Sequence, residues 1–354
     1  MKKLIVLVAA MLMISGMAYA DPAWDFYGSA RVQMQWNNLQ VDAAADQDTF
    51  AQAMYATSRV GANVKVSDEL SGQVEYGTAN GVANIRLLYG TWNFGGGKLI
   101  IGQDYAPLFT ISSLSIWSQN GAAVGEEIGL FNGGVHTNRL AQVKLSIGGL
   151  EAALLAPLST TITGTAAGAA NDTFAPQIQA AYTHKMDNMY AKVGAGYSTF
   201  NREVGALDYD VDAWVVMLAG GINVNMFSIK GNVFMGDNVG QILLMDVDGT
   251  FGDGLASSDA ADVIDNECLG YLVSARAKLN DTFSLEAGFG AVKTELDQAG
   301  SVEDDSKAYY LQAGITLAPG VSVTPEIGVV DYERTAAGAN DKTNYAAIKW
   351  QINF

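Results

Sequence analysis

Alternation of polar and apolar side chains, over segments of about ten residues, constrains the fold of this chain more than any other feature. Near the end of the chain, Ile348, Trp350 and Ile352 take every second position. Lys349 and Gln351 lie between them. Because successive side chains of a strand point to opposite faces, this pattern predicts strands with one apolar and one polar face.

Sixteen segments of this kind follow one another. They span 24–36, 53–66, 70–77, 84–94, 97–104, 138–147, 150–157, 175–186, 188–199, 210–223, 226–236, 268–279, 282–293, 307–317, 321–332 and 343–354. The two faces are hard to tell apart in 84–104, 150–157 and 210–223. After the amino-terminal region no run reaches roughly 18 apolar residues, so the sequence predicts no membrane-spanning helix.

The connections between these segments alternate in length. Tight ones such as Gly148-Gly149 and Asn280-Asp281 alternate with long ones such as 37–52, 105–137 and 237–267. A soluble sandwich gives no reason for the long connections to share one end, whereas an outer-membrane barrel has short periplasmic turns and long external loops. The sequence therefore predicts an all-β fold, a transmembrane antiparallel β-barrel of about sixteen strands.

The amino terminus has the composition of an export signal. Residues 2–3 are basic, residues 4–14 are apolar, and residues 18–20 form an A-x-A cleavage site. We expect residues 1–20 to be a signal peptide that is removed, because the apolar run is too short to span a membrane. Residues 21–354 then form a single barrel domain.

Charge and composition exclude several classes of function. The chain has 20 basic and 37 acidic residues and a formal net charge of −17, which opposes binding to nucleic acid. One cysteine and two histidines leave no disulfide framework and no Cys/His metal cluster. His136 and His184 lie in no catalytic motif, and no P-loop, G-x-S-x-G or H-E-x-x-H sequence occurs. The sequence predicts neither an enzyme nor a cofactor.

Several short motifs resemble general bacterial porins. Residues 58–63 followed by 68–72 look like the second strand and turn of that family, and residues 95–108 resemble the strand that enters the third loop. Residues 138–140 resemble the strand that leaves it, and a terminal Phe354 is similar to the porin assembly signal. The resemblance implies a sixteen-stranded, trimeric, water-filled channel in a Gram-negative outer membrane. Here Gln103 stands where many porins carry Arg, and the second external loop, 78–83, is short for a trimer latch.

Closing the barrel would bring basic residues of the first, second and last strands together. Their lumen-facing positions hold Arg31, Arg59 and Lys349, and like charges side by side suit a wet lumen rather than a dry core. We expect the long segment 105–137 to fold into the pore as a third loop. The candidate constriction residues are Arg31, Arg59, Arg86, Lys349, Glu126 and Glu127. The alternative is that these side chains only solvate an interior face.

The predicted external loops are acidic. Asp246, Asp248 and Asp253 are a weak calcium candidate, because an EF-hand loop would need Gly at position 251 and Glu at position 257, where Phe and Ser stand. We expect loosely bound divalent cations such as calcium instead. These would bridge the loops to outer-membrane lipids and lipopolysaccharide.

Two alternatives to passive diffusion of ions and small hydrophilic solutes stay open at this stage. A substrate-specific channel for a sugar or an anion would line its lumen with aromatic side chains, for which Trp92, Trp117 and Trp214 are candidates. A surface adhesin or receptor barrel would act through its acidic loops.

Assembly features can also be predicted. Small residues at outward positions, Gly28, Ala30, Ala62 and Gly72, would let barrels pack closely, so we expect a homotrimer interface at the first strands. Phe354 ends an alternating strand, and we expect its deletion to hamper insertion.

Overall fold

The computed structural model is a closed antiparallel β-barrel of sixteen strands, as the sequence predicted. The structure describes residues 23–42, 45–78, 82–118, 127–163, 170–172, 175–204, 207–245, 252–259, 262–301, 303–334 and 341–354. Among them, helix is confined to one short α-helical turn and one short 3₁₀ turn, and no helix is long and apolar enough to cross a membrane.

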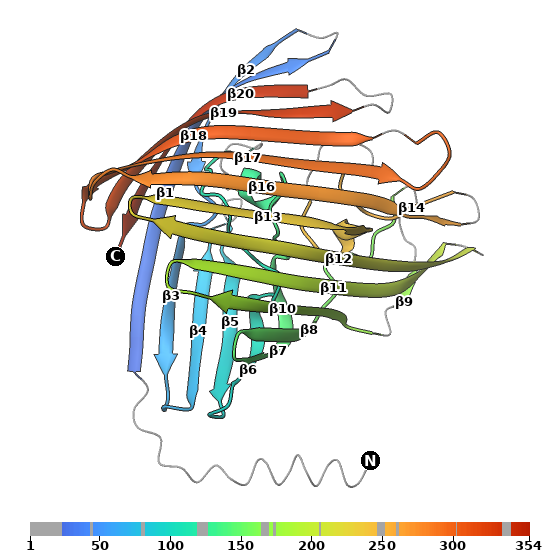
Figure 1. Ribbon diagram of the computed structural model, residues 1–354, viewed down its shortest axis with the longest axis horizontal. Coiled ribbons are helices and arrows are strands. Elements are labelled where there is room, and N and C mark those ends of the chain that lie inside the picture. Colours follow the sequence, from blue (N-terminus) through green and yellow to red (C-terminus); the bar gives the residue numbers. More distant parts are fainter. Residues whose placement is uncertain are drawn as a thin grey trace.

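The strands follow one another around the barrel in chain order (Figure 1). They are β1 (Ala23–Val41), β2 (Gln47–Met54), β3 (Arg59–Lys65), β4 (Leu70–Gly77), β5 (Asn84–Asn93), β6 (Lys98–Tyr105), β7 (Arg139–Ile147), β8 (Leu150–Leu155), β9 (Ala170–Asp172), β10 (Gln177–Lys185), β11 (Met189–Val204), β12 (Leu207–Val224), β13 (Phe227–Asp237), β16 (Asn266–Lys278), β17 (Phe283–Leu296), β18 (Asp304–Ala318), β19 (Val321–Arg334) and β20 (Asp341–Asn353). The short elements α2 (Glu127–Leu130), η2 (Val239–Gln241), β14 (Ser257–Ser258) and β15 (Val263–Ile264) lie in the connections.

Two barrel strands are interrupted, which reconciles eighteen sheet segments with sixteen strands among the described residues. β2 and β3 both pair with β1, one above the other, and β9 and β10 both pair with β11. β20 pairs with β19 on one side and with β1 on the other, and this pairing closes the barrel.

The first long connection is shorter than the sequence predicted. β1 continues to Val41 and β2 begins at Gln47, where 37–52 was expected to be a loop. The ring of Trp36 lies 5.1 Å from that of Phe50 across this hairpin. Beyond the membrane both faces of a strand meet water, so Asn, Gln and Asp occupy both faces and the alternation disappears from the sequence.

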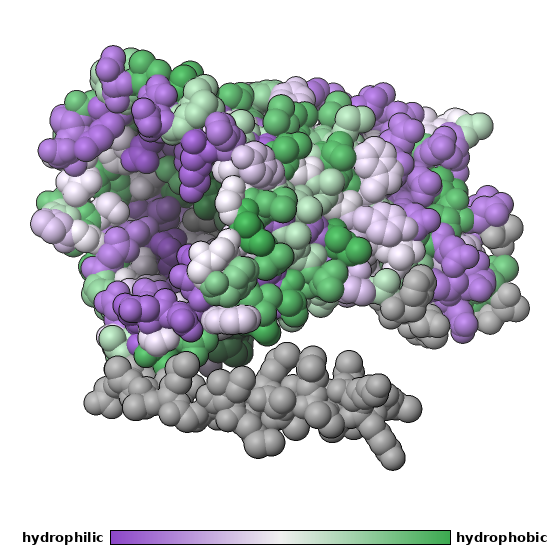
Figure 2. All heavy atoms as spheres, turned by 60° about the horizontal axis from the view of Figure 1, so that its bottom comes forward, coloured by the Kyte–Doolittle hydropathy of each residue, from purple (hydrophilic) through white to green (hydrophobic). Residues whose placement is uncertain are grey.

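The outer surface carries the apolar face of the strands. Large side chains such as Phe26, Ile101 and Leu218 are more than half exposed. Figure 2 shows an apolar band across the middle of the barrel, with hydrophilic residues gathered towards its two ends. Their inward-facing neighbours are polar, and Gln33 and Gln35 of β1 are fully buried.

The carboxyl terminus seals the barrel. The Phe354 backbone N–H donates to the Gly28 carbonyl at 3.0 Å, and the Gly28 N–H donates to the Phe354 carbonyl at 2.6 Å. A Cβ on Gly28 would lie 2.3 Å from the Phe354 ring, so the absence of a side chain at Gly28 makes room for that ring.

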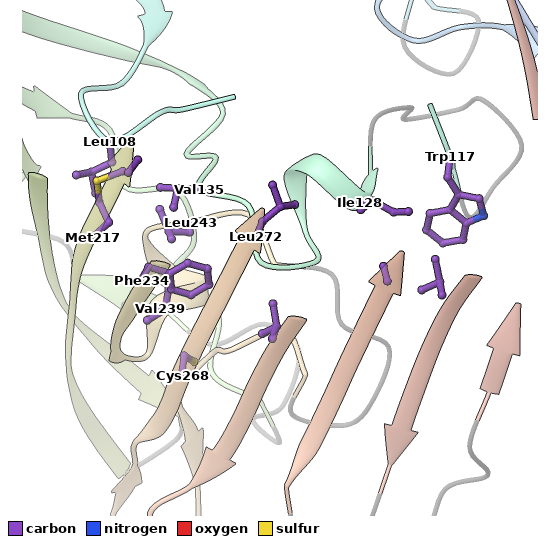
Figure 3. Close-up of a cluster of buried hydrophobic side chains, with 14 of the residues drawn as sticks. Leu108, Trp117, Ile128, Val135, Met217, Phe234, Val239, Leu243, Cys268 and Leu272 are labelled. Carbon is purple, nitrogen blue, oxygen red and sulfur yellow. The ribbon is translucent and has the colours of Figure 1, made fainter. Parts of the chain in front are cut away.

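Part of the interior is a hydrophobic core instead of a water-filled lumen. Inward-facing Val215 and Met217 of β12, Phe234 of β13 and Leu272 of β16 pack against the loops between strands (Figure 3). This explains the ambiguous pattern of 210–223: the inner face of β12 meets protein and the outer face meets the surroundings, so both faces are apolar.

Candidate constriction site

The third loop connects β6 and β7, and its described parts, residues 106–118 and 127–138, run along the inner wall of the barrel. Its backbone is hydrogen-bonded by side chains from a series of strands. Lys192 of β11 donates to the Phe109 carbonyl at 2.7 Å, and Ser274 of β16 donates to the Ser112 carbonyl at 2.6 Å. The loop therefore lies within the barrel rather than above it.

Two buried carboxylates hold the next part of the loop. Glu286 of β17 accepts a hydrogen bond from the Leu114 N–H at 2.8 Å. Glu326 of β19 accepts from the Ile116 N–H at 2.9 Å. On β1, Gln33 donates to the Ile116 carbonyl at 2.8 Å. Because β10, β11, β16, β17, β19 and β1 supply partners in turn, residues 108–118 follow the wall from β10 to β1.

Glycines let the loop backbone touch the wall. Gly133 has a φ of +86°, and a Cβ there would lie 2.0 Å from the Tyr271 carbonyl oxygen of β16. A Cβ on Gly290 of β17 would lie 2.0 Å from the Asn132 carbonyl oxygen. Any side chain at either position would push the loop inwards.

Arg31 of β1 lies two positions before Gln33, which binds the third loop. Its Nε donates to the Ser29 hydroxyl at 2.9 Å, and its guanidinium also donates to the Thr57 hydroxyl. The Arg31 backbone exchanges hydrogen bonds with the Ser58 hydroxyl at 3.0 Å in each direction. These residues occupy the break between β2 and β3, so the interruption of that strand positions the arginine.

Arg59 of β3 and Arg86 of β5 share one carboxylate. Glu75 of β4 lies 2.6 Å from the Arg86 Nε and 3.5 Å from the Arg59 Nε, and it also accepts from the Tyr27 hydroxyl at 2.8 Å. The Arg59 side chain is 30% exposed, whereas those of Arg86 and Glu75 are nearly fully buried. Arg59 therefore keeps the most access to solvent.

Arg139, the first residue of β7, completes the basic group. Its guanidinium carbon lies 5.7 Å from the ring centroid of Tyr105, which stacks on Phe109 at 4.2 Å. His136 packs edge-on against Phe109, and its Nδ1 accepts from the Asn138 N–H at 2.9 Å. Burial lowers the pKa of His136 to about 3, and the charge of Arg139 adds to the effect, so this histidine is neutral at ordinary pH.

These four arginines line one cavity of about 340 Å³, which we call the arginine cavity. The remaining lining comes mostly from loop residues, among them Phe109, Leu130, Phe131 and Leu244. Among the described residues, no carboxylate lines this cavity. The arrangement places concentrated positive charge beside an opening, which attracts anions and repels cations.

The six predicted constriction residues fall into three groups. Arg31, Arg59 and Arg86 meet at the arginine cavity. Lys349 is not part of its lining, and its ammonium lies 5.1 Å from the ring centroid of Tyr55. Glu126 lies outside the described residues, as does the side chain of Glu127, the first residue of α2.

Glu75, the carboxylate that contacts both Arg59 and Arg86, was not identified by the sequence analysis. Glu75 alternates with Gln73 on the inward face of the segment 70–77, and that parity was the available signal. Arg139 was not among the six predicted constriction residues, and as the first residue of β7 it has no alternating strand residue before it.

The calcium candidate is only partly described. Asp246 and Asp248 lie outside the described residues. Burial raises the pKa of Asp253, because water solvates its charged carboxylate poorly there. Within the described ranges, no three His, Cys, Asp or Glu side chains are grouped as a metal site.

Comparison with known proteins identifies the family. A family model described as Gram-negative porin matches residues 5–337. The chain belongs to the Gram-negative porin family. This porin matched no curated protein.

Solved structures with the same fold come from several bacteria. The outer membrane channel DcaP of Acinetobacter baumannii superposes with a TM-score of 0.73 at 15% identity, covering 94% of this chain and 97% of that one. The anion-selective porin from Comamonas acidovorans gives 0.59 at 12% identity, covering 94% and 100%. The trimer form of OmpT from Vibrio cholerae gives 0.57 at 16% identity, covering 95% and 100%.

The family and the barrel agree with the sequence prediction of an outer-membrane channel. This porin is a β-barrel of the outer membrane that permits passive diffusion across it.

Proposed function

We propose that this porin passes small hydrophilic solutes and ions through the arginine cavity, with a preference for anions. One observation carries the proposal: four arginines and no described carboxylate line the cavity. Glu75 contacts Arg59 and Arg86 without lining this cavity, and its one charge offsets only part of theirs.

The acidic outer end of the barrel opposes this preference only weakly. Carboxylates such as those of Glu267, Glu303 and Glu333 are exposed to solvent, where salt screens a charge beyond about 8–10 Å. Charges that line a narrow passage act on an ion at closer range and with less water between them. The passage therefore decides the sign of the selectivity, although the whole chain is acidic.

The test is the zero-current potential of single channels in a planar bilayer under a gradient of dilute potassium chloride. We expect a zero-current potential whose sign shows that chloride is more permeant than potassium. A potential of the cation-selective sign would overturn it, and an absence of channels would favour a receptor or adhesin.

We also propose a homotrimer. The strands of one wall, from β4 to β8, have only 6–10 residues, whereas β11, β12, β13 and β16 to β20 have 11–18. Since a strand needs about 9–11 residues to span a bilayer, contact with neighbouring barrels suits the short wall better than lipid does. The solved OmpT trimer form has the same fold.

The sequence-based expectation for this interface needs one revision. Gly28 is covered by the Phe354 ring, and Ala62 is only 1% exposed, so Ala30 and Gly72 remain as outward small residues. Light scattering in detergent tests the oligomer: a trimer mass supports it, and a monomer as the sole species would contradict it.

Other parts of the proposal rest on sequence. Residues 1–20 act as a cleaved signal peptide, which mass spectrometry of the purified protein would test by finding Asp21 at the amino terminus. Outer-membrane lipids and lipopolysaccharide surround the barrel, with divalent cations such as calcium bound loosely at the acidic loops. The protein acts as a channel and carries no enzymatic activity or cofactor.

A further inference from the structure

A second connection turns into the barrel and meets the third loop. In residues 238–245, which follow β13 and which we call the inserted segment, Val239, Ile242 and Leu243 are fully buried. Figure 3 shows Leu243 beside Val135 of the third loop, near Phe234 on the wall. The backbone N–H of Leu244 donates to the His136 carbonyl at 2.7 Å, so the two loops are joined directly.

Hydrogen bonds hold the start of the inserted segment. Asn238, at a φ of 55°, donates from its side chain to the Asp212 carbonyl at 2.8 Å and to the Asp265 carboxylate at 2.6 Å. Its Oδ1 accepts from the Asn266 N–H at 2.9 Å. These bonds tie the turn to β12 and to the beginning of β16.

The middle of the segment is held as firmly. Gln241 donates to the Thr161 carbonyl at 2.6 Å and accepts from the Ala256 N–H at 3.3 Å. A Cβ on Gly240 would lie 2.1 Å from the Asp253 carbonyl oxygen, so this backbone packs in close contact with the rest of its loop. The apolar residues of the inserted segment are buried and its side-chain amides are hydrogen-bonded, so the segment is a fixed element of the barrel interior.

Only Leu244 of this segment reaches the arginine cavity. The basic part of the lining comes from the strands β1, β3, β5 and β7. Most of the apolar part comes from the third loop and from Leu244, and its third-loop members are Phe109, Ile111, Leu130 and Phe131. Leu244 is half-buried, so its side chain is in contact with both the packed loops and the opening.

We propose that the inserted segment is a second constriction element and that Leu244 helps to set the width of the passage. This rests on the proposed function, since it assumes that solutes cross the arginine cavity. Leu244 carries no charge, so changing its size alters the width of the passage without altering the electrostatic potential of the arginines. Size selection and charge selection are then separable properties of different residues.

The experiment compares uptake of uncharged sugars by liposomes that contain the porin. Leu244→Ala should increase the rate for a trisaccharide more than the rate for a monosaccharide, and Leu244→Trp should reduce the trisaccharide rate. Leu255→Ala is the matched control, because Leu255 belongs to the same connection but does not line the cavity. Heat-dependent mobility in gel electrophoresis verifies that each barrel is folded.

Ion selectivity is measured on the same preparations, and it separates the two proposals. Altered sugar uptake in the Leu244 variants alone, with an unchanged zero-current potential, would support the inference. Sugar rates equal to those of the unmodified porin in both Leu244 variants would overturn it, as would an equal change in Leu255→Ala. A cation-selective unmodified porin would overturn the proposed anion preference, while the sugar result would still decide the role of Leu244.

Discussion

Removing the charge of Arg59 should weaken the preference of the channel for anions. Arg59 is the best test of the cavity because its side chain is 30% exposed, whereas that of Arg86 is nearly fully buried. In Arg59→Gln the carboxylate of Glu75 keeps its 2.6 Å contact with Arg86, so no buried charge is left without a partner.

The size of the effect follows from the distance between the side chain and a permeating ion. Two unit charges about 7 Å apart interact by roughly 0.6 kcal/mol at the dielectric constant of water and by about 2.4 kcal/mol at an effective value near 20. The exposure of Arg59 and the nearby Glu75 favour the lower figure. An anion loses about 0.6 kcal/mol of attraction and a cation loses as much repulsion, so the anion-to-cation ratio should fall about sevenfold.

The assay is the zero-current potential across a planar bilayer with a gradient of dilute potassium chloride. Lys65→Gln is the matched control, since Lys65 also lies on β3 but is 64% exposed and pairs with Asp68 at the turn. The difference between the variants should shrink near 1 M salt, where the Debye length is about 3 Å. Equal potentials for Arg59→Gln and Lys65→Gln in dilute salt, with both barrels folded, would refute the assignment of Arg59 to the passage.

Three further predictions concern other parts of the barrel. Glu75→Gln should increase the anion preference, because it removes the charge that partly offsets Arg59 and Arg86; an unchanged zero-current potential would count against this. His136 should add no step to the selectivity between about pH 8 and pH 5, since its pKa is lowered to about 3; a step near pH 6.5 that disappears in His136→Gln would contradict its burial. The same shift means that the folded loop is most favoured above about pH 6.5 and loses that advantage as the pH falls towards 3. Deleting Phe354, or replacing Gly28 by Val, should reduce the amount of folded barrel in the outer membrane, because each disrupts the pairing that seals β20 to β1; normal levels of both variants would be evidence against that role.

The sequence predicted the barrel because alternation is a local property that each strand records separately. The pattern of Ile348, Trp350 and Ile352 needs no knowledge of the rest of the chain, and the same applies to the tight turns at Gly148-Gly149. Strand ends were less predictable, since beyond the membrane both faces of a strand meet water. The pairing of β1 with β2 shows this, because its Asn and Gln residues interrupt the alternation where the two strands continue.

The site was predictable only where strand order determines which residues are neighbours. Chain order alone puts Arg31 and Arg59 on adjacent strands, and their parity points them inwards. Glu75 shares the inward face with Arg59 through the regular pairing of β3 with β4. Its contact with Arg86 depends on a register shift between β4 and β5 at Glu75 and Tyr76, which local alternation does not show. The place of Leu244 depends on a long-range contact with His136, for which the sequence offers no periodic signal.

The sign of the zero-current potential of the unmodified porin in dilute potassium chloride tests the central claim most directly. Four arginines on the lining of the cavity predict that chloride crosses more readily than potassium, and that this preference weakens as salt approaches 1 M. A potential of the cation-selective sign at low salt would contradict the claim that these arginines line the narrowest part of the passage.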